Sequence, residues 1–166
     1  MNANYYIQHL HLQPHPEGGF FKETYRAIEG IPADALPARF AGARSYSTAI
    51  YYLLQQGDFS AFHRIQSDEC WHFYAGEPLL IHAIEGNGEY YCIRLGCNIA
   101  AGETFQFVVP ATAWFASEPA PGSTFTLAGC TVAPGFDFDD FEMAGRNMLL
   151  AAYPQHSAII NLLTRK

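Results

Sequence analysis

The fold is decided by residues 57–76, which read GDFSAFHRIQSDECWHFYAG. A glycine stands at each end, and two aromatic-rich runs of alternating character lie between them. The polar residues Gln66, Ser67 and Asp68 separate the runs and are typical of a tight turn. This pattern predicts a strand, a turn and a second strand, paired as a hairpin.

Alternate residues of a strand share one face, which fixes the neighbours of each side chain. His63 and Ile65 then face one way on the first strand, and Glu69, Trp71 and Phe73 share a face on the second. In a regular hairpin the two sets face the same interior. The sequence therefore predicts an imidazole and a carboxylate together in an aromatic pocket.

Composition narrows the class of protein. The 166 residues are 49% apolar, enough for a single globular domain over residues 1–166 with a sizeable core. A net charge of -7 supplies no basic patch, so we expect neither nucleic acid nor membrane as a partner. No signal peptide and no membrane-length apolar run is visible, which predicts a cytoplasmic protein. The four cysteines form no Cys-x-x-Cys pair, and we expect reduced, mostly buried thiols.

The rest of the chain reads as short strands separated by turns, with helical turns at both ends. This spacing is typical of an all-β barrel or jelly roll. Residues 4–12 and 154–163 carry the helical patterns, residues 28–43 a surface excursion, and residues 137–140 a solvated acidic turn. The other strands are expected at residues 20–27, 46–54, 79–84, 89–95, 105–109, 113–116 and 124–132.

Two segments near the N-terminus bear on the pocket. Residues 13–19, QPHPEGG, form a structured loop, in which His15 and Glu17 either contact a ligand or belong to loop architecture alone. On strand 20–27, alternation puts Tyr25 on the face of Phe21 and Glu23, and Arg26 on the opposite face. Arg26 and Arg64 are therefore expected to form ion pairs away from the pocket.

The spacing of these residues resembles the cupin motifs. The first cupin motif is Gly, five residues, His-x-His, three or four residues, Glu, six residues, Gly. Its positions are occupied here by Gly57, His63, Ile65 (in place of the second His), Glu69 and Gly76. The second motif is matched more loosely by Gly102, Pro110 and Thr112, with Phe115 in place of its histidine.

The chain is also similar to a small family of uncharacterised cupin-like proteins. The matching segments are residues 15–19, 23–26, 67–69, 71–73, 114 and 132–138. The resemblance implies a double-stranded β-helix that is usually a homodimer, with strand 20–27 able to cross to the partner's sheet. It also implies a comparison with deoxy-sugar-nucleotide epimerases, and it supplies no activity.

Metal binding is the first functional interpretation. The resemblance implies a site of three histidines and one glutamate, a set that suits iron, manganese or nickel. Ile65 and Phe115 replace two of these ligands, so we expect no metal and no other cofactor. His72 is out of phase and points to the other face, whereas His82 could approach from a neighbouring strand. A metal-dependent oxygenase or isomerase remains an alternative.

The leading interpretation is a metal-independent site for a small, sugar-like ligand, with isomerase or epimerase chemistry. The resemblance gives His63 as the base and Glu69 as the orienting or second acid–base group. Tyrosine often serves as the acid in such epimerases, and Tyr25 is the candidate by strand-face parity only. Where the epimerases carry Arg-Gly-Leu-His, this chain reads SAFH over residues 60–63, which weighs against a nucleotide diphosphate.

The third interpretation is a non-catalytic, storage-like cupin that binds a small molecule without turnover. An apolar cleft with a few polar groups is typical of such sites. Plain core packing is the competing explanation for each aromatic residue. The expected lining of this cleft is Ile65, Trp71, Phe73, Trp114 and Phe115.

Overall fold

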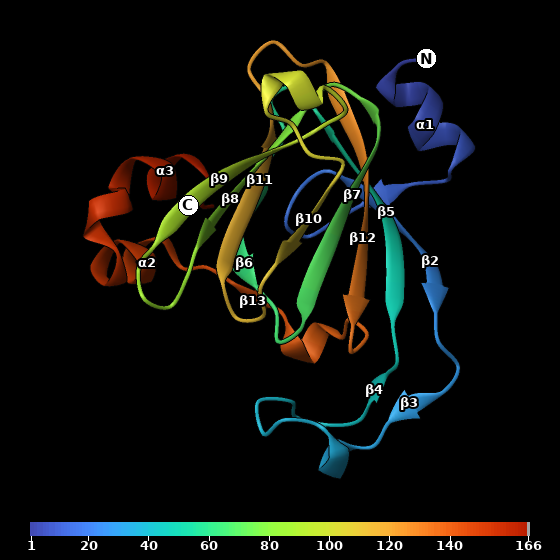
Figure 1. The fold of residues 1–166 in the computed structure, drawn as a ribbon, viewed down its shortest axis with the longest axis vertical. Helices are drawn as coiled ribbons and strands as arrows, with labels where there is room; N and C mark the ends of the chain where they lie inside the picture. Colours follow the sequence, from blue (N-terminus) through green and yellow to red (C-terminus); the bar gives the residue numbers. More distant parts are fainter. Residues whose placement is uncertain (166) are drawn as a thin grey trace.

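Two antiparallel sheets face each other in the computed structural model, which describes residues 1–165 (Figure 1). One sheet has the order β1 (Gln13–Pro14), β2 (Phe20–Arg26), β5 (Thr48–Gln55), β12 (Phe125–Ala133), β7 (Asp68–Gly76) and β10 (Gln106–Val109). The other has the order β13 (Glu142–Met143), β6 (Ser60–Arg64), β11 (Trp114–Pro119), β8 (Leu79–Ile84) and β9 (Tyr90–Leu95). This arrangement confirms the predicted jelly roll.

The hairpin predicted for residues 57–76 is wrong in its pairing. Strand β6 pairs with β11 and β13, whereas β7 pairs with β12 and β10 in the opposite sheet. The turn crosses between sheets, and Ser67 Oγ holds it there by donating to the carbonyl of Pro134 at 2.7 Å. His63 and Glu69 still face one interior, but from opposite walls. The hairpin of β8 and β9 forms as predicted.

The hydrophobic core lies between the sheets, and helices cover their outer faces. Tyr52, Trp71, Ile81 and Phe115 are among its fully buried side chains. Helix α1 (Ala3–His9) lies against β5 and β12 of the first sheet. Helices α2 (Arg146–Ala152) and α3 (Ser157–Leu162) lie beside the second, where Ile160 is fully buried, as the helical pattern near the C-terminus predicts (Figure 1).

A β-bulge in β2 changes which residues face the interior. Glu23 pairs with Ile50, and Tyr25 pairs with the adjacent Ala49 of β5. Thr24 is therefore left as the extra residue. A bulge reverses the alternation beyond it. The prediction that Tyr25 faces the pocket is therefore wrong, and its side chain is 54% exposed. Arg26 takes the inward place, which also corrects its predicted position.

The remaining expectations concern the surface. Residues 28–43 project from the sheets as an arm, in which β3 (Gly30–Ile31) pairs with β4 (Arg44–Ser45) (Figure 1). All four cysteines are free, but only Cys130 is buried, so the expectation of mostly buried thiols is wrong. Among residues 1–165, no helix has the length and apolar character that a membrane crossing requires.

Candidate functional site

A cavity opens between the two sheets, beside the crossing turn of residues 64–68. Its empty volume is about 590 Å³ when the open space at its mouth is included. Polar and apolar side chains share its wall. The lining residues are His15, Glu17, Phe21, Glu23, Arg26, Thr48, Ile50, His63, Ile65, Glu69, Cys130, Val132, Phe136, Phe138 and Phe141.

The loop after β1 brings Glu17 into the cavity. Gly18 and Gly19 have φ values of 124° and 68°, and a Cβ on Gly18 would collide with the carbonyl of Phe59. This close approach lets the amide of Ala61 donate to the carbonyl of Glu17 at 2.9 Å. The hydroxyl of Tyr52 donates to the carbonyl of Gly18 at 2.7 Å. The two glycines are therefore needed to place the Glu17 carboxyl against β6.

Glu17 and His63 form the central polar contact of the cavity. His63 Nε2 lies 3.0 Å from Glu17 Oε2, and both side chains are buried. His63 Nδ1 lies 2.8 Å from the carbonyl of Ala61, an acceptor only, so Nδ1 must carry a proton. Nε2 is the ring nitrogen that faces the carboxyl of Glu17. The two side chains therefore form one polar unit that the Ala61 carbonyl orients.

His15 stands on the other side of Glu17 as a neutral ring. The amide of Glu17 donates to His15 Nδ1 at 3.3 Å, and Nδ1 lies 3.7 Å from Glu17 Oε1. Burial lowers the pKa of His15, although the Glu17 charge opposes the effect. Its ring meets Phe21 edge-on, with ring centroids 4.5 Å apart. His15 thus packs the loop and carries no charge at neutral pH.

Glu69 enters the cavity from the six-stranded sheet. The residue is 8% exposed, and burial raises the pKa of its carboxyl to about 8, with the charge of Glu17 adding to the effect. The neighbouring Cys130 thiol lowers this pKa slightly. Glu69 is therefore protonated at neutral pH and can donate a proton or a hydrogen bond into the cavity.

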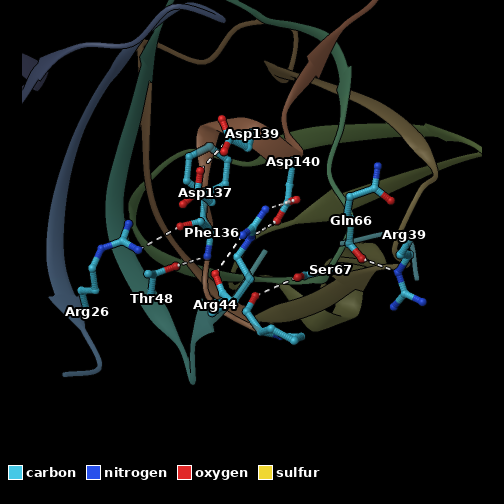
Figure 2. Close-up of polar contacts among 12 residues, drawn as sticks. Arg26, Arg39, Arg44, Thr48, Gln66, Ser67, Phe136, Asp137, Asp139 and Asp140 are labelled. Carbon is cyan, nitrogen blue, oxygen red and sulfur yellow. Dashed lines mark hydrogen bonds and ion pairs between the residues drawn. The ribbon is translucent and has the colours of Figure 1, made fainter. Parts of the chain in front are cut away.

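An ion pair lies at the mouth. Arg26 binds Glu23 through two contacts, Nη2 to Oε2 at 2.7 Å and Nε to Oε1 at 3.1 Å. The third contact of Arg26 runs from Nη1 to the carbonyl of Phe136 at 3.0 Å (Figure 2). Both charged side chains are about two-fifths exposed. The pair links β2 to the loop that carries the phenylalanines.

That loop, residues 134–141, supplies an aromatic wall. Phe136 and Phe138 stand edge to face with ring centroids 5.0 Å apart, and Phe141 lies 5.3 Å from the ring of His63. Arg44 anchors the loop through two 2.7 Å contacts to the carboxylate of Asp140 (Figure 2). Asp140 is 5% exposed, so the prediction of a fully solvated acidic turn is wrong at this position.

The predicted aromatic lining lies mostly elsewhere. Ile65 lines the cavity, but Trp71 and Phe115 are buried in the core and Phe73 packs against it. The Phe115 ring supports His63 with centroids 4.1 Å apart. Trp114 faces the C-terminal helices on the outer side of β11, because adjacent strand residues cannot share a face.

Glu17 and the three phenylalanines were not among the candidates that alternation selects. They lie on loops, where no strand periodicity applies. The available signals were the Pro- and Gly-rich segment 13–19 and the segment 132–138, both of which carried the family resemblance.

The cupin metal set does not fit these residues. Ile65 and Phe115 have no donor atoms, and both nitrogens of His63 already have partners. His72 points outward and contacts Thr131 at 3.1 Å, as predicted, and His82 lies under the C-terminal helices with the hydroxyl of Tyr90 at 2.8 Å, away from the cavity. Within the described part of the chain, no three His, Cys, Asp or Glu side chains are arranged to hold a metal ion.

Comparisons with known proteins agree with this fold. The family model described as "Cupin superfamily (DUF985)" matches residues 4–144. An uncharacterized protein of Saccharomyces cerevisiae, YML079W, is 31% identical over 146 residues, which cover 81% of this chain and 71% of the yeast protein. The family match therefore includes both the N-terminal loop and the aromatic wall.

Solved structures show the same likeness. A hypothetical protein from Leishmania major has a TM-score of 0.90 and 32% identity, covering all of both chains. Protein SO0799 from Shewanella oneidensis has a TM-score of 0.89 and 42% identity, covering 99% of this chain and 98% of that one. Oxalate decarboxylase from Bacillus subtilis, at 12% identity and a TM-score of 0.55, covers 92% of this chain and 37% of its own, and shares the fold alone.

Proposed function

This chain belongs to the cupin superfamily family DUF985, and we propose that it is a metal-independent acid–base catalyst, an isomerase or epimerase of a small hydroxycarbonyl compound. One observation carries this proposal. A carboxyl that holds its proton at neutral pH, Glu69, faces the same cavity as the Glu17–His63 pair. Enzymes that catalyse enolisation usually combine a proton acceptor and a proton donor in one site, and the surroundings of each group set its pKa for that role.

The Glu17–His63 pair is the proposed base. His63 Nε2 occupies Glu17 Oε2, so Glu17 Oε1 is the oxygen left to take a proton from the carbon next to a carbonyl. The imidazole stabilises the carboxylate before the transfer and shares the proton after it. This assignment differs from the sequence-based expectation of His63 as the base and Glu69 as its partner, because Glu17 takes the proton and His63 supports it.

Glu69 is the proposed acid. Its proton passes to the carbonyl oxygen as the carbon–hydrogen bond breaks, and an enediol forms without free charge. Return of the proton to the same face of the carbon regenerates the substrate, return to the opposite face epimerises it, and return to the neighbouring carbon isomerises it. In each case the hydroxyl that becomes the carbonyl gives its proton back to Glu69. Every atom required is supplied by the substrate and the two groups.

The aromatic wall would hold the ligand against these groups. Phe138 is 56% exposed at the mouth, whereas Phe136 and Phe141 lie deeper. Aromatic faces and the side chains of Ile50, Ile65 and Val132 leave few polar positions, so polar recognition is concentrated on the acid–base groups.

Deuterium incorporation tests the proposal. Chelator-treated full-length protein in deuterium oxide is incubated with dihydroxyacetone, and exchange of the carbon-bound hydrogens is followed by proton NMR. We expect exchange above the buffer rate, reduced about 10²- to 10⁴-fold in Glu17→Gln and in His63→Ala. Glu29→Gln, at an exposed position away from the cavity, is the matched control.

Three outcomes would count against the proposal. Equal exchange rates in Glu17→Gln and wild type would show that Glu17 is not the base. Exchange that stops on chelation and returns with a divalent cation would favour the metal-dependent alternative. A ligand that binds tightly and never exchanges would favour the storage-like alternative.

A further inference from the structure

The polar groups deep in the cavity are already paired or neutral. The Glu17 carboxyl is occupied by His63, whose Nε2 lies 3.0 Å from Oε2, and His63 Nδ1 contacts the carbonyl of Ala61. Glu69 and His15 are both neutral at pH 7, because burial raises the pKa of the acid and lowers that of the base. Among the described lining residues, a ligand therefore meets no free cationic side chain deep in the cavity.

Arg26 is the only arginine or lysine among the described residues of the lining. Its Nε and Nη2 donate to Glu23, and its Nη1 donates to the carbonyl of Phe136. A phosphate or carboxylate that reached this guanidinium would find Nε and one proton of each Nη already engaged, and would lie beside the Glu23 carboxylate. An anion placed deeper would lose hydration without gaining a cation.

From this geometry we propose that the site takes an uncharged, unphosphorylated hydroxycarbonyl compound, and that Glu23 sets this preference by holding Arg26. The inference rests on the proposed function and adds the charge class of the substrate. It makes Glu23 a specificity-determining residue at the mouth, separate from the proton transfers deeper in the cavity.

Isothermal titration calorimetry on the full-length protein tests the preference with matched pairs of probes. The pairs are dihydroxyacetone with its phosphate, and glyceraldehyde with glyceraldehyde 3-phosphate. We expect the wild type to bind the unphosphorylated member about tenfold more tightly or better, since burying an unpaired anion is costly. Each pair differs only in the phosphate, so the ratio of the two affinities isolates charge.

Two variants test whether the Glu23–Arg26 ion pair sets the ratio of the two affinities. Glu23→Gln frees Arg26, and we expect the ratio to move roughly threefold to tenfold toward the phosphorylated member. The double variant Glu23→Gln/Arg26→Gln should lose that gain. A merely structural role for Glu23 would change both members alike and leave the ratio in place.

Failure of this inference is distinguishable from failure of the proposed function. Tighter binding of the phosphorylated probe by the wild type, an unchanged ratio in Glu23→Gln, or no binding of either probe would overturn the charge class. The proposed function depends instead on whether bound ligand exchanges its hydrogens with solvent, whichever member of the pair is bound.

Discussion

Replacing Glu69 by Gln should stabilise the protein, and more strongly as the pH rises. The carboxyl is 8% exposed, and its pKa is about 8 in place of the ordinary 4.5. The folded protein therefore keeps a proton that the unfolded chain releases between pH 4.5 and 8, and stability falls across that window. Glutamine has the shape of the protonated acid and never ionises, so the variant escapes this loss.

The magnitude follows from the pKa difference. Each pH unit between the two pKa values costs about 1.4 kcal/mol. Glu69→Gln should thus gain about 3 kcal/mol in free energy of unfolding at pH 7 and about 5 kcal/mol at pH 9, with no gain at pH 4. For a domain of this size, 3 kcal/mol corresponds to a rise in Tm of roughly 6–12 °C.

Urea unfolding of wild type and Glu69→Gln at pH 4, 5.5, 7 and 9 measures this difference directly, with Glu29→Gln as the control. Other groups titrate in the same range, and those that do not interact with Glu69 cancel in the difference, whereas Glu17 and Cys130 are coupled to it. A difference that stays constant with pH, or a Glu69→Gln protein less stable than wild type at pH 9, would refute the assignment of Glu69 as a buried neutral acid.

Three further predictions follow from the scaffold of the site. Arg44→Ala leaves Asp140 buried without its partner and should lower the free energy of unfolding in urea by about 3–5 kcal/mol. The double variant with Asp140→Ala should recover part of this loss. Additive losses from the two single changes would contradict a stabilising ion pair. Gly18→Ala should cost about 1–3 kcal/mol and lower deuterium exchange, because a side chain there meets the carbonyl of Phe59; wild-type stability would contradict this. Tyr25→Phe should leave exchange within about twofold and stability within about 0.5 kcal/mol, since the ring faces solvent; a large loss of exchange would restore Tyr25 as the acid.

Short strands at fairly even spacing and the cupin motif predicted the fold, and strand alternation predicted part of the site. It placed His63, Ile65 and Glu69 on one interior, and all three line the cavity. It failed on β2, where the bulge at Thr24 reverses the faces of the residues that follow. A bulge depends on pairing with a distant strand, and nothing local in the sequence marks it.

The partner of His63 could not be derived from strand periodicity. Glu17 lies on a loop that positive-φ glycines and contacts to β5 and β6 fold back over the cavity. These contacts join residues far apart in the chain, so they appear only in the assembled fold. The burial of Asp140 by Arg44, 96 residues away, is hidden from the sequence for the same reason.

The acid–base assignment depends most directly on the protons of His63. Nitrogen-15 NMR of the histidine rings at pH 7 reads the protonation of Nδ1 and Nε2, and Glu17→Gln identifies the His63 signals. The account predicts a protonated Nδ1 and an Nε2 signal that shifts strongly in Glu17→Gln. An unprotonated Nδ1, or an Nε2 signal that is the same in both proteins, would contradict the Glu17–His63 pairing and the base built on it.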